Sequence, residues 1–176
     1  MADLFAANHH DALTEQERAE QGFVQGGLDV DTLRSMAEDG GLLVADDEGR
    51  LAGLLGLASA ESMPSPPPPI QALLNAKDSL QWRGQSLRSA AWLLYGPLVV
   101  AAAYRGKGVA RGLFTAGREA ASAHADVMVA FIELANQASG KVHVDGFGMT
   151  PLGEFTLRGR TYGVVGASTT VSDAGT

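Results

Sequence analysis

Cysteine is absent from the 176-residue sequence. This absence excludes disulfide bonds, thiolate metal ligands and cysteine nucleophiles. Long hydrophobic runs are missing too: the longest, residues 90–104, is interrupted by Gly96 and Pro97 and falls short of the roughly 18 residues of a membrane-spanning helix. The opening residues Met1-Ala2-Asp3-Leu4 lack the basic and then apolar pattern of a signal peptide, so we expect a cytoplasmic protein with no membrane partner.

Positive charge is in short supply. The chain has 13 lysines and arginines against 20 aspartates and glutamates, which gives a formal net charge of −7. An acidic surface repels phosphate backbones, so nucleic acid is not expected as a partner. The same acidity suits a cationic acceptor such as an amine, although it also serves solubility alone.

The composition is typical of a folded globular protein, with 45% hydrophobic and 19% charged residues. The length suits one hydrophobic core, so we expect a single domain over residues 1–170 and a flexible tail over residues 171–176. The adjacent His9 and His10 do not by themselves predict a metal site, because such a site needs further ligands.

The order of predicted elements indicates a mixed α/β sheet. Thr14 and Glu17 have the spacing of a capping box, which marks the start of a helix. Two apolar segments flank the turn sequence Asp46-Asp47-Glu48-Gly49, which predicts a hairpin. We predict strands over residues 42–45, 50–58, 93–100, 127–134, 152–157 and 161–167. We predict helices over residues 14–21, 30–38, 70–80 and 136–143, and from residue 108 to about residue 124.

Proline marks two further features. The run Pro66–Pro69 favours an extended polyproline conformation, because proline is excluded from helix interiors. Pro97 lies inside an apolar strand and cannot donate a ladder hydrogen bond, so a bulge or local break is expected there. The polar segment 81–89 is either a surface connection or a lid over a binding site.

The segment Tyr104-Arg105-Gly106-Lys107-Gly108-Val109-Ala110-Arg111 joins a buried strand to an amphipathic helix. The first amides of a helix have no intrahelical partner, and the helix dipole adds partial positive charge there. Glycines allow a ligand to approach the backbone closely, and the three basic side chains add full charges. This combination predicts a phosphate or pyrophosphate site.

Two common nucleotide motifs do not fit this segment. A P-loop requires Ser or Thr after its Gly-Lys pair, and here Lys107 precedes Gly108 with no hydroxyl residue following. A dinucleotide fingerprint requires Gly-x-Gly-x-x-Gly, whereas Gly106-x-Gly108 is followed by Gly112, one residue too late.

The pattern Arg105-x-x-Gly108-x-Ala110 closely resembles the Arg/Gln-x-x-Gly-x-Gly/Ala signature of the GNAT acetyltransferases. The segment 131–136, which ends in Asn136, is similar to a later motif of that family in which a strand leads to an Asn and a short helix. Ser139, His143 and Gly146-Phe147 continue this second match, and the final hairpin resembles the closing strands of the family. The specific resemblance covers residues 92–167.

The resemblance implies the GNAT acyl-CoA N-acyltransferase fold, an α/β fold with a mostly antiparallel central sheet, one splayed parallel strand pair and flanking helices. It implies acetyl-CoA as co-substrate and no metal. Asn136 and Ser139 would contact the pantetheine arm of the coenzyme. A backbone amide of Leu98, Val99 or Val100 would donate to the thioester carbonyl. The pyrophosphate would lie against Arg105, Gly106, Lys107, Gly108, Val109, Ala110 and Arg111.

The implied reaction moves acetyl to a primary amine of a small molecule or peptide by direct attack in a ternary complex. An alkyl amine with a pKa near about 10.4 must lose a proton before it attacks. Glu133 is a candidate base or a structural ion-pair partner. Tyr95 either relays a proton and binds acceptor or only packs, and His143 is either the acid that protonates the departing thiolate or a residue without a catalytic role.

Another class of function stays open at this point. A non-catalytic acyl-CoA-binding sensor or interaction module would carry the same coenzyme loop. The acceptor is not identified by the sequence, and the oligomeric state is open, although dimers are common in the family.

Overall fold

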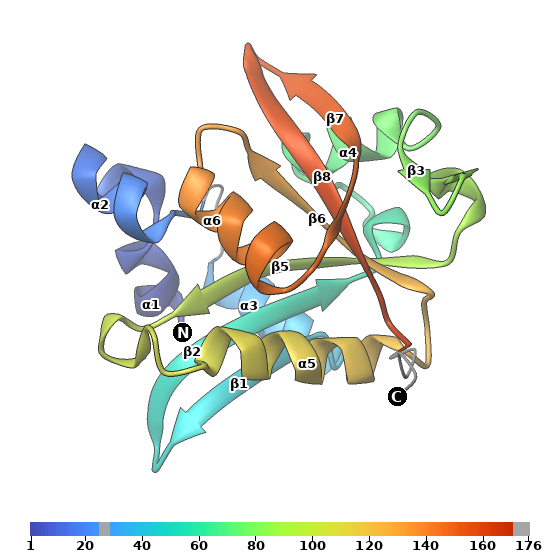
Figure 1. The fold of residues 1–176 in the computed structure, drawn as a ribbon. Helices are drawn as coiled ribbons and strands as arrows, with labels where there is room; N and C mark the ends of the chain where they lie inside the picture. The colour runs from blue at the N-terminus through green and yellow to red at the C-terminus, as the bar shows by residue number, and fades with distance from the viewer. Residues whose placement is uncertain (25–28, 171–176) are drawn as a thin grey trace, which may run out of the picture.

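A computed structural model describes residues 1–24 and 29–170 of the chain (Figure 1). The tail expected over residues 171–176 lies outside the described residues. The main sheet has six strands in the order β1-β2-β5-β6-β8-β7. All neighbours in it are antiparallel except β5 and β6, which are parallel. Its strands are β1 (Leu42–Asp47), β2 (Arg50–Ala58), β5 (Trp92–Val100), β6 (Val127–Glu133), β7 (Thr150–Leu157) and β8 (Arg160–Ser168).

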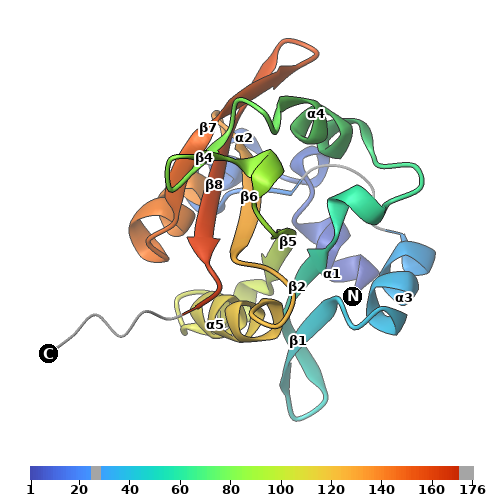
Figure 2. The same cartoon turned by 90° about the vertical axis from the view of Figure 1, so that its right-hand side faces the viewer.

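Helices cover both faces of this sheet (Figure 2). On one face lie α5 (Val109–Ala121) and α6 (Gln137–Lys141), and α6 continues into a π-helical turn, Val142–Gly146. On the other face lie α1 (Ala2–Ala7), α3 (Val30–Glu38) and α4 (Pro68–Ala76). The helix α2 (Glu15–Gln21) lies beside α6 (Figure 1). These observations confirm the predicted fold class: a mixed, mostly antiparallel sheet with one parallel pair and flanking helices.

The capping box predicted at Thr14 and Glu17 forms, and a second side chain caps α3. The Thr14 hydroxyl accepts a hydrogen bond from the Glu17 amide at 3.2 Å, and the Glu17 carboxylate accepts one from the Thr14 amide at 2.8 Å. This is a complete capping box at the start of α2. At α3, the Asp29 carboxylate accepts from the Thr32 amide at 2.8 Å.

The proline-rich segment differs from its prediction in one respect. Pro68 and Pro69 form the first turn of α4 and are not extended. Proline is tolerated there because the first helical amides have no intrahelical acceptor to lose. The expectation of an extended conformation for all four prolines was therefore wrong for the last two.

The segment 81–89 forms a two-stranded hairpin, β3 (Gln81–Trp82) with β4 (Gln85–Ser86), followed by a short 3-10 turn. Leu80 and Leu87, at its two ends, are fully buried in the same hydrophobic cluster as Leu73 of α4. Burial of both ends fixes this segment against the core. The structure therefore favours a packed connection over a lid.

The side chains of β6 point alternately to the two faces of the sheet, and both faces are covered, which explains why its sequence is apolar without interruption. Val127 and Val129 are fully buried in the cluster beneath α4, whereas Met128 is fully buried in the cluster beneath α5. A central strand covered on both faces needs apolar side chains at every position. The strand predicted over residues 127–134 is therefore buried on both faces along its first three residues.

The parallel pair separates soon after it begins. β5 and β6 pair only over Trp92–Leu94 and Val127–Val129. Beyond Leu94 the register of β5 against β2 shifts, close to Pro97, while β6 stays paired with β8 as far as Glu133. The two strands therefore diverge towards their carboxyl ends (Figure 1), and the break expected at Pro97 is confirmed.

Candidate active site

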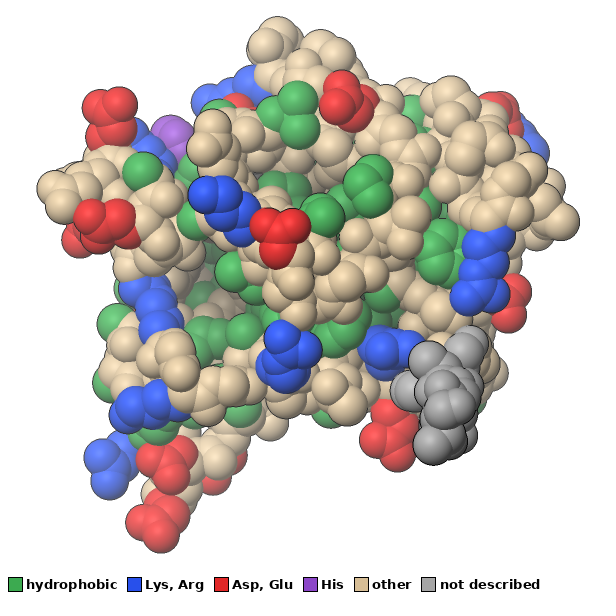
Figure 3. Space-filling view, in the orientation of Figure 1, with side chains coloured by type: hydrophobic (Ala, Val, Ile, Leu, Met, Phe, Trp, Pro, Cys, Tyr) green, Lys and Arg blue, Asp and Glu red, His purple; other side chains and the backbone are tan. Residues whose placement is uncertain are grey.

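A cavity of about 360 Å³ lies where β5 and β6 separate. Figure 3 shows this face of the molecule hollowed between α2, α6 and the end of β5, with hydrophobic side chains inside the hollow and basic side chains around it. The two parallel strands contribute Leu94, Tyr95, Gly96, Pro97, Leu98, Ala130, Phe131, Ile132 and Glu133. Other elements contribute Phe5, Phe23, Val24, Thr32, Met36, Ala58, Met63, Pro67, Pro69, Ile70, Asn136, Ser139, His143 and Tyr162.

Backbone geometry distinguishes the three candidate amides, those of Leu98, Val99 and Val100, that could donate a hydrogen bond to the thioester carbonyl. The Ala101 amide donates to Ala52 O at 2.9 Å, so it points towards β2. Amides alternate in direction along an antiparallel strand, so the Val99 amide also faces β2. The amides of Leu98 and Val100 face the opposite side, where β6 has moved away. Of these two residues, Leu98 lines the cavity.

The loop before α5 presents a row of backbone amides without acceptors. Gly106 and Gly108 have φ values of +71° and +83°, a left-handed conformation that glycine adopts at little cost. Within residues 1–24 and 29–170, the amides of Gly106, Gly108, Val109 and Ala110 donate to no protein oxygen. Successive free amides at a helix N-terminus form a cradle for an anion. The space beside both glycines is open, because an added Cβ would meet nothing within 4 Å.

The basic side chains of this loop have partners inside the protein. Arg105 donates to Asn8 Oδ1 at 2.6 Å and also to the Gln21 side chain, so it ties the loop to the N-terminal segment. Arg111 Nη2 donates to Gly146 O at 2.7 Å. Lys107 Nζ lies 5.5 Å from the centre of the Tyr104 ring. The amides are thus donors that the backbone holds in place, and the side chains add positive charge around them.

Asn136 and Ser139 lie together at the start of α6 and both line the cavity. Asn136 caps the helix by accepting from the Ser139 amide at 3.3 Å, and its Nδ2 donates to Phe23 O at 2.8 Å. Only 5% of Asn136 is exposed. Asn136 therefore also connects α6 to the N-terminal segment, in parallel with Arg105.

Glu133 reaches the cavity from the end of β6, and its side chain is 13% exposed. Its carboxylate lies 3.3 Å from Arg160 Nη1 on β8, and Tyr162 is its register partner on the same strand. The structure thus places Glu133 at the cavity and also gives it the ion pair that a structural role would require.

His143 and Tyr95 meet on the cavity wall, with ring centroids 5.6 Å apart and nearly perpendicular planes. His143 Nδ1 lies 2.7 Å from Ser139 O. A carbonyl oxygen only accepts, so Nδ1 carries the proton and Nε2 is left as an acceptor in the neutral ring. Burial lowers the pKa of His143. The hydrogen bond to Ser139 acts in the opposite direction but has the smaller effect.

The Tyr95 hydroxyl is buried, and in the part of the chain that the structure describes it has no hydrogen-bond partner. Burial raises the pKa of Tyr95, so the phenol stays protonated. Buried hydroxyl groups almost always have a partner. Tyr95 lines the cavity, and its hydroxyl is the buried polar group that the described protein leaves without a partner.

Comparison with known proteins identifies the architecture. A model of the acetyltransferase (GNAT) family matches residues 9–149. The chain belongs to the GNAT acetyltransferase family. No curated protein sequence matches it. Membership of this family supports acetyl transfer in general.

Solved structures share the GNAT fold with this chain. The protein smu.2055 from Streptococcus mutans UA159 aligns over 96% of this chain and 94% of its own, with 16% identity and a TM-score of 0.59. The yncA protein from Salmonella typhimurium, solved with its cofactor acetyl-CoA, aligns over 85% and 79%, with 19% identity and a TM-score of 0.55. A ribosomal-protein-alanine N-acetyltransferase from Brucella melitensis aligns over 77% and 74%, with 22% identity and a TM-score of 0.51. At these identities the likeness shows the fold alone.

The N-terminal contribution to the site was not predicted. Phe5, Phe23 and Val24 line the cavity of this GNAT fold, although nothing in their sequence neighbourhood indicates a site. Among the described residues, no group of three or more His, Cys, Asp or Glu is placed to hold a metal ion. The described helices also include none long and apolar enough to cross a bilayer.

Proposed function

We propose that this GNAT chain is an acetyl-CoA-dependent N-acetyltransferase that acetylates a primary amine of a small molecule or peptide by direct attack in a ternary complex. One observation carries the proposal. The cavity between the diverging strands brings the Leu98 amide side of β5 together with Glu133 and His143, and β5 leads directly from this cavity to the cradle of free amides.

The residues present fit the coenzyme. The amides of Gly106, Gly108, Val109 and Ala110 would hold its pyrophosphate, because they are free donors at a helix N-terminus. Asn136 and Ser139 would lie along the pantetheine arm, and Val100, whose amide faces the gap, would border it. Acetyl-CoA supplies the thioester, and the chain supplies donors, a proton acceptor and exclusion of water.

The Leu98 amide is the proposed donor to the carbonyl oxygen. Negative charge grows on that oxygen as the amine attacks, and a donor already fixed in a strand stabilises the charge without reorganising. Val99 is excluded from this role because its amide faces β2. The strand thus holds the donor in place before substrate arrives.

Proton removal is assigned to Glu133, directly or through one water. An ammonium group with a pKa near about 10.4 needs a base at neutral pH. The pKa of His143 is lowered by burial, which favours the neutral ring with Nε2 as acceptor. His143 is therefore a second candidate for the base, and its proposed role as an acid would require it to take up a proton during turnover.

The alternative is a coenzyme-binding module without catalysis. The ion pair between Glu133 and Arg160 favours it, because a purely structural carboxylate would have such a partner. Two measurements on the purified chain separate the alternatives. Calorimetry should show acetyl-CoA binding, and thiol release with a panel of primary amines should show turnover. Binding of acetyl-CoA with no turnover on any amine would favour the module.

A further inference from the structure

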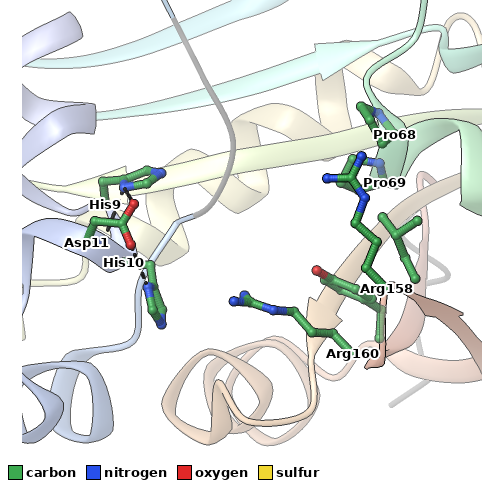
Figure 4. A pocket seen from close by; sticks show the side chains of 9 residues that line it. His9, His10, Asp11, Pro68, Pro69, Arg158 and Arg160 are labelled. Atoms are coloured by element: carbon green, nitrogen blue, oxygen red, sulfur yellow. Dashed lines mark hydrogen bonds and ion pairs between the residues drawn. The ribbon is translucent and has the colours of Figure 1, made fainter.

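A second hollow of about 400 Å³ borders the cavity between the diverging strands. Both are lined by Pro69 and Tyr162, so they adjoin each other. One wall of the second hollow comes from the segment after α1, and another comes from the β7–β8 hairpin (Figure 4). Its lining residues are His9, His10, Asp11, Pro68, Pro69, Leu157, Arg158, Arg160 and Tyr162.

This hollow is basic, in contrast to the chain as a whole. Two arginines of the hairpin and two histidines of the opposite wall border it, although the net charge of the chain is −7. Figure 4 shows Arg160 reaching across towards His10. The one carboxylate of the lining, Asp11, lies 3.1 Å from His10 Nδ1, and the Asp11 backbone amide donates to His9 Nδ1 at 3.3 Å.

Arg158 is the side chain of this hollow that lacks an ion-pair partner. Arg160 binds Glu133, but in the described chain no carboxylate lies within ion-pair distance of Arg158. Arg158 and Gly159 have φ values of +49° and +77°, the pattern of a type I′ hairpin turn. This tight turn fixes the backbone from which the guanidinium reaches the hollow. A guanidinium offers a planar set of donors that matches a carboxylate or a phosphate.

We propose that the acceptor amine carries an anionic group, a carboxylate or a phosphate, that binds in this hollow. The proposal rests on the proposed function. The anionic group contacts Arg158, with Arg160 adding positive charge, while the amine reaches Glu133 past Tyr162. The acidic net charge suggested a cationic acceptor, but the charge that decides acceptor binding is the local charge of this hollow.

Acceptors matched in length and differing in their far end test the proposal. β-Alanine, O-phosphoethanolamine, ethanolamine and 1,3-diaminopropane end in a carboxylate, a phosphate, a hydroxyl and an amine, and 6-aminohexanoate and 1,6-diaminohexane repeat the test at greater length. Thiol release from acetyl-CoA gives kcat/KM for each. We expect the anionic acceptors to exceed the hydroxyl and diamine acceptors at least tenfold. Comparison of kcat/KM for β-alanine and O-phosphoethanolamine shows whether the hollow prefers a carboxylate or a phosphate.

Substitutions locate the effect. Arg158→Gln should lower kcat/KM about ten- to a hundredfold for the anionic acceptors, the range of a lost charged hydrogen bond, and several-fold less for ethanolamine. Arg158→Lys should retain part of the preference. Arg83→Gln is the matched control, because Arg83 also has a left-handed φ, +51°, before a glycine but lies in the β3–β4 turn away from the hollow. It should keep the preference of the unsubstituted chain.

A binding measurement keeps the proposal separate from catalysis. Calorimetry with N-acetyl-β-alanine and N-acetylphosphoethanolamine, on the chain saturated with coenzyme A, requires no acetyl transfer. Anion binding that Arg158→Gln abolishes would support the hollow even if every amine failed as an acceptor, a result that would reject only the enzymatic function. A preference for diamines, or anion binding that Arg158→Gln leaves intact, would overturn the proposal.

Discussion

The proposed coenzyme side and the proposed acceptor side of this GNAT domain use different chemistry. The cradle before α5 would bind its ligand through main-chain amides, and such a turn requires glycine at fixed positions, here Gly106 and Gly108. The hollow beside β7 and β8 would use side chains that come from opposite ends of the chain, such as His10 and Arg160. Recognition by backbone leaves a compact motif in the sequence, whereas recognition by scattered side chains leaves none.

The two sides are also joined. Arg105 of the coenzyme loop binds Asn8 and Gln21, and Asn136 of α6 binds the backbone of Phe23. Two residues of the family motifs thus hold the N-terminal segment whose residues line the proposed acceptor cavity. We expect coenzyme binding and order in the acceptor site to be coupled through these contacts.

The largest effect should come from the carboxylate between the two sides. Glu133→Gln removes the proposed proton acceptor, so kcat should fall by about a factor of 10² to 10⁴ while the Kd for acetyl-CoA changes little. Steady-state kinetics and calorimetry measure the two quantities. Arg160→Gln is the control, because it breaks the same ion pair and leaves the carboxylate. Equal losses of kcat in both variants would assign Glu133 a structural role.

The next effect separates the cradle from an ordinary glycine turn. Gly108→Glu places negative charge beside the expected pyrophosphate and forces a left-handed φ on a residue that resists it, so the Kd for acetyl-CoA should rise by about a hundredfold or more. Gly84→Glu carries the same strain, because Gly84 has φ +80° in the open turn between β3 and β4. Calorimetry should find its affinity unchanged. Similar affinities for the two variants would remove the cradle from coenzyme binding.

A smaller effect tests the link between the two sides. Arg105→Ala removes two side-chain hydrogen bonds, so the free energy of unfolding should fall by about 1–2 kcal/mol. Hydrogen exchange should rise over residues 8–24 more than over β6. Lys107→Ala, in the same loop but without a partner in the N-terminal segment, serves as control. Unchanged exchange over residues 8–24 in Arg105→Ala would show that this contact does not hold the segment.

The smallest effect concerns His143. Burial lowers the pKa of His143 in the folded chain. Below a pH of about 6.5, His143 therefore takes up a proton in the unfolded chain more readily than in the folded chain. The free energy of unfolding falls as the pH drops below that value. His143→Gln should flatten the dependence of Tm on pH in the acidic range below that value and leave it unaltered above. His124→Gln, at an exposed position, should keep the original slope. If His143→Gln keeps the original dependence of Tm on pH, that dependence comes from other groups.

Much of the fold could be predicted because local signals agree with it. The capping box of α2, the break at Pro97 and the apolar run of β6 each follow from rules that act over a few residues. The helix α1 was missed because no side chain caps it, so it lacks a start signal. Pro68 and Pro69 were misjudged because a first helical turn and an extended segment tolerate proline equally well.

The candidate site could be predicted only in part, for the same reason. The cradle is continuous in sequence, so its glycines and its helix start were visible together. The partners of Arg105 lie 84 and 97 residues away, and the walls of the basic hollow lie still farther apart in the chain. No local pattern encodes such contacts. Glu133 was found because it ends a buried strand, but its ion pair depends on the register of β8.

Amide chemical shifts test the central claim most directly. The purified chain, labelled with ¹⁵N, is titrated with acetyl-CoA while the backbone amide resonances are followed. New hydrogen bonds to the pyrophosphate and the thioester should move the amides of Gly106, Gly108, Val109 and Ala110, and that of Leu98, more than the amide of Val99, which faces β2. Saturable binding of acetyl-CoA that leaves the resonances of these amides unshifted would contradict the proposed coenzyme site.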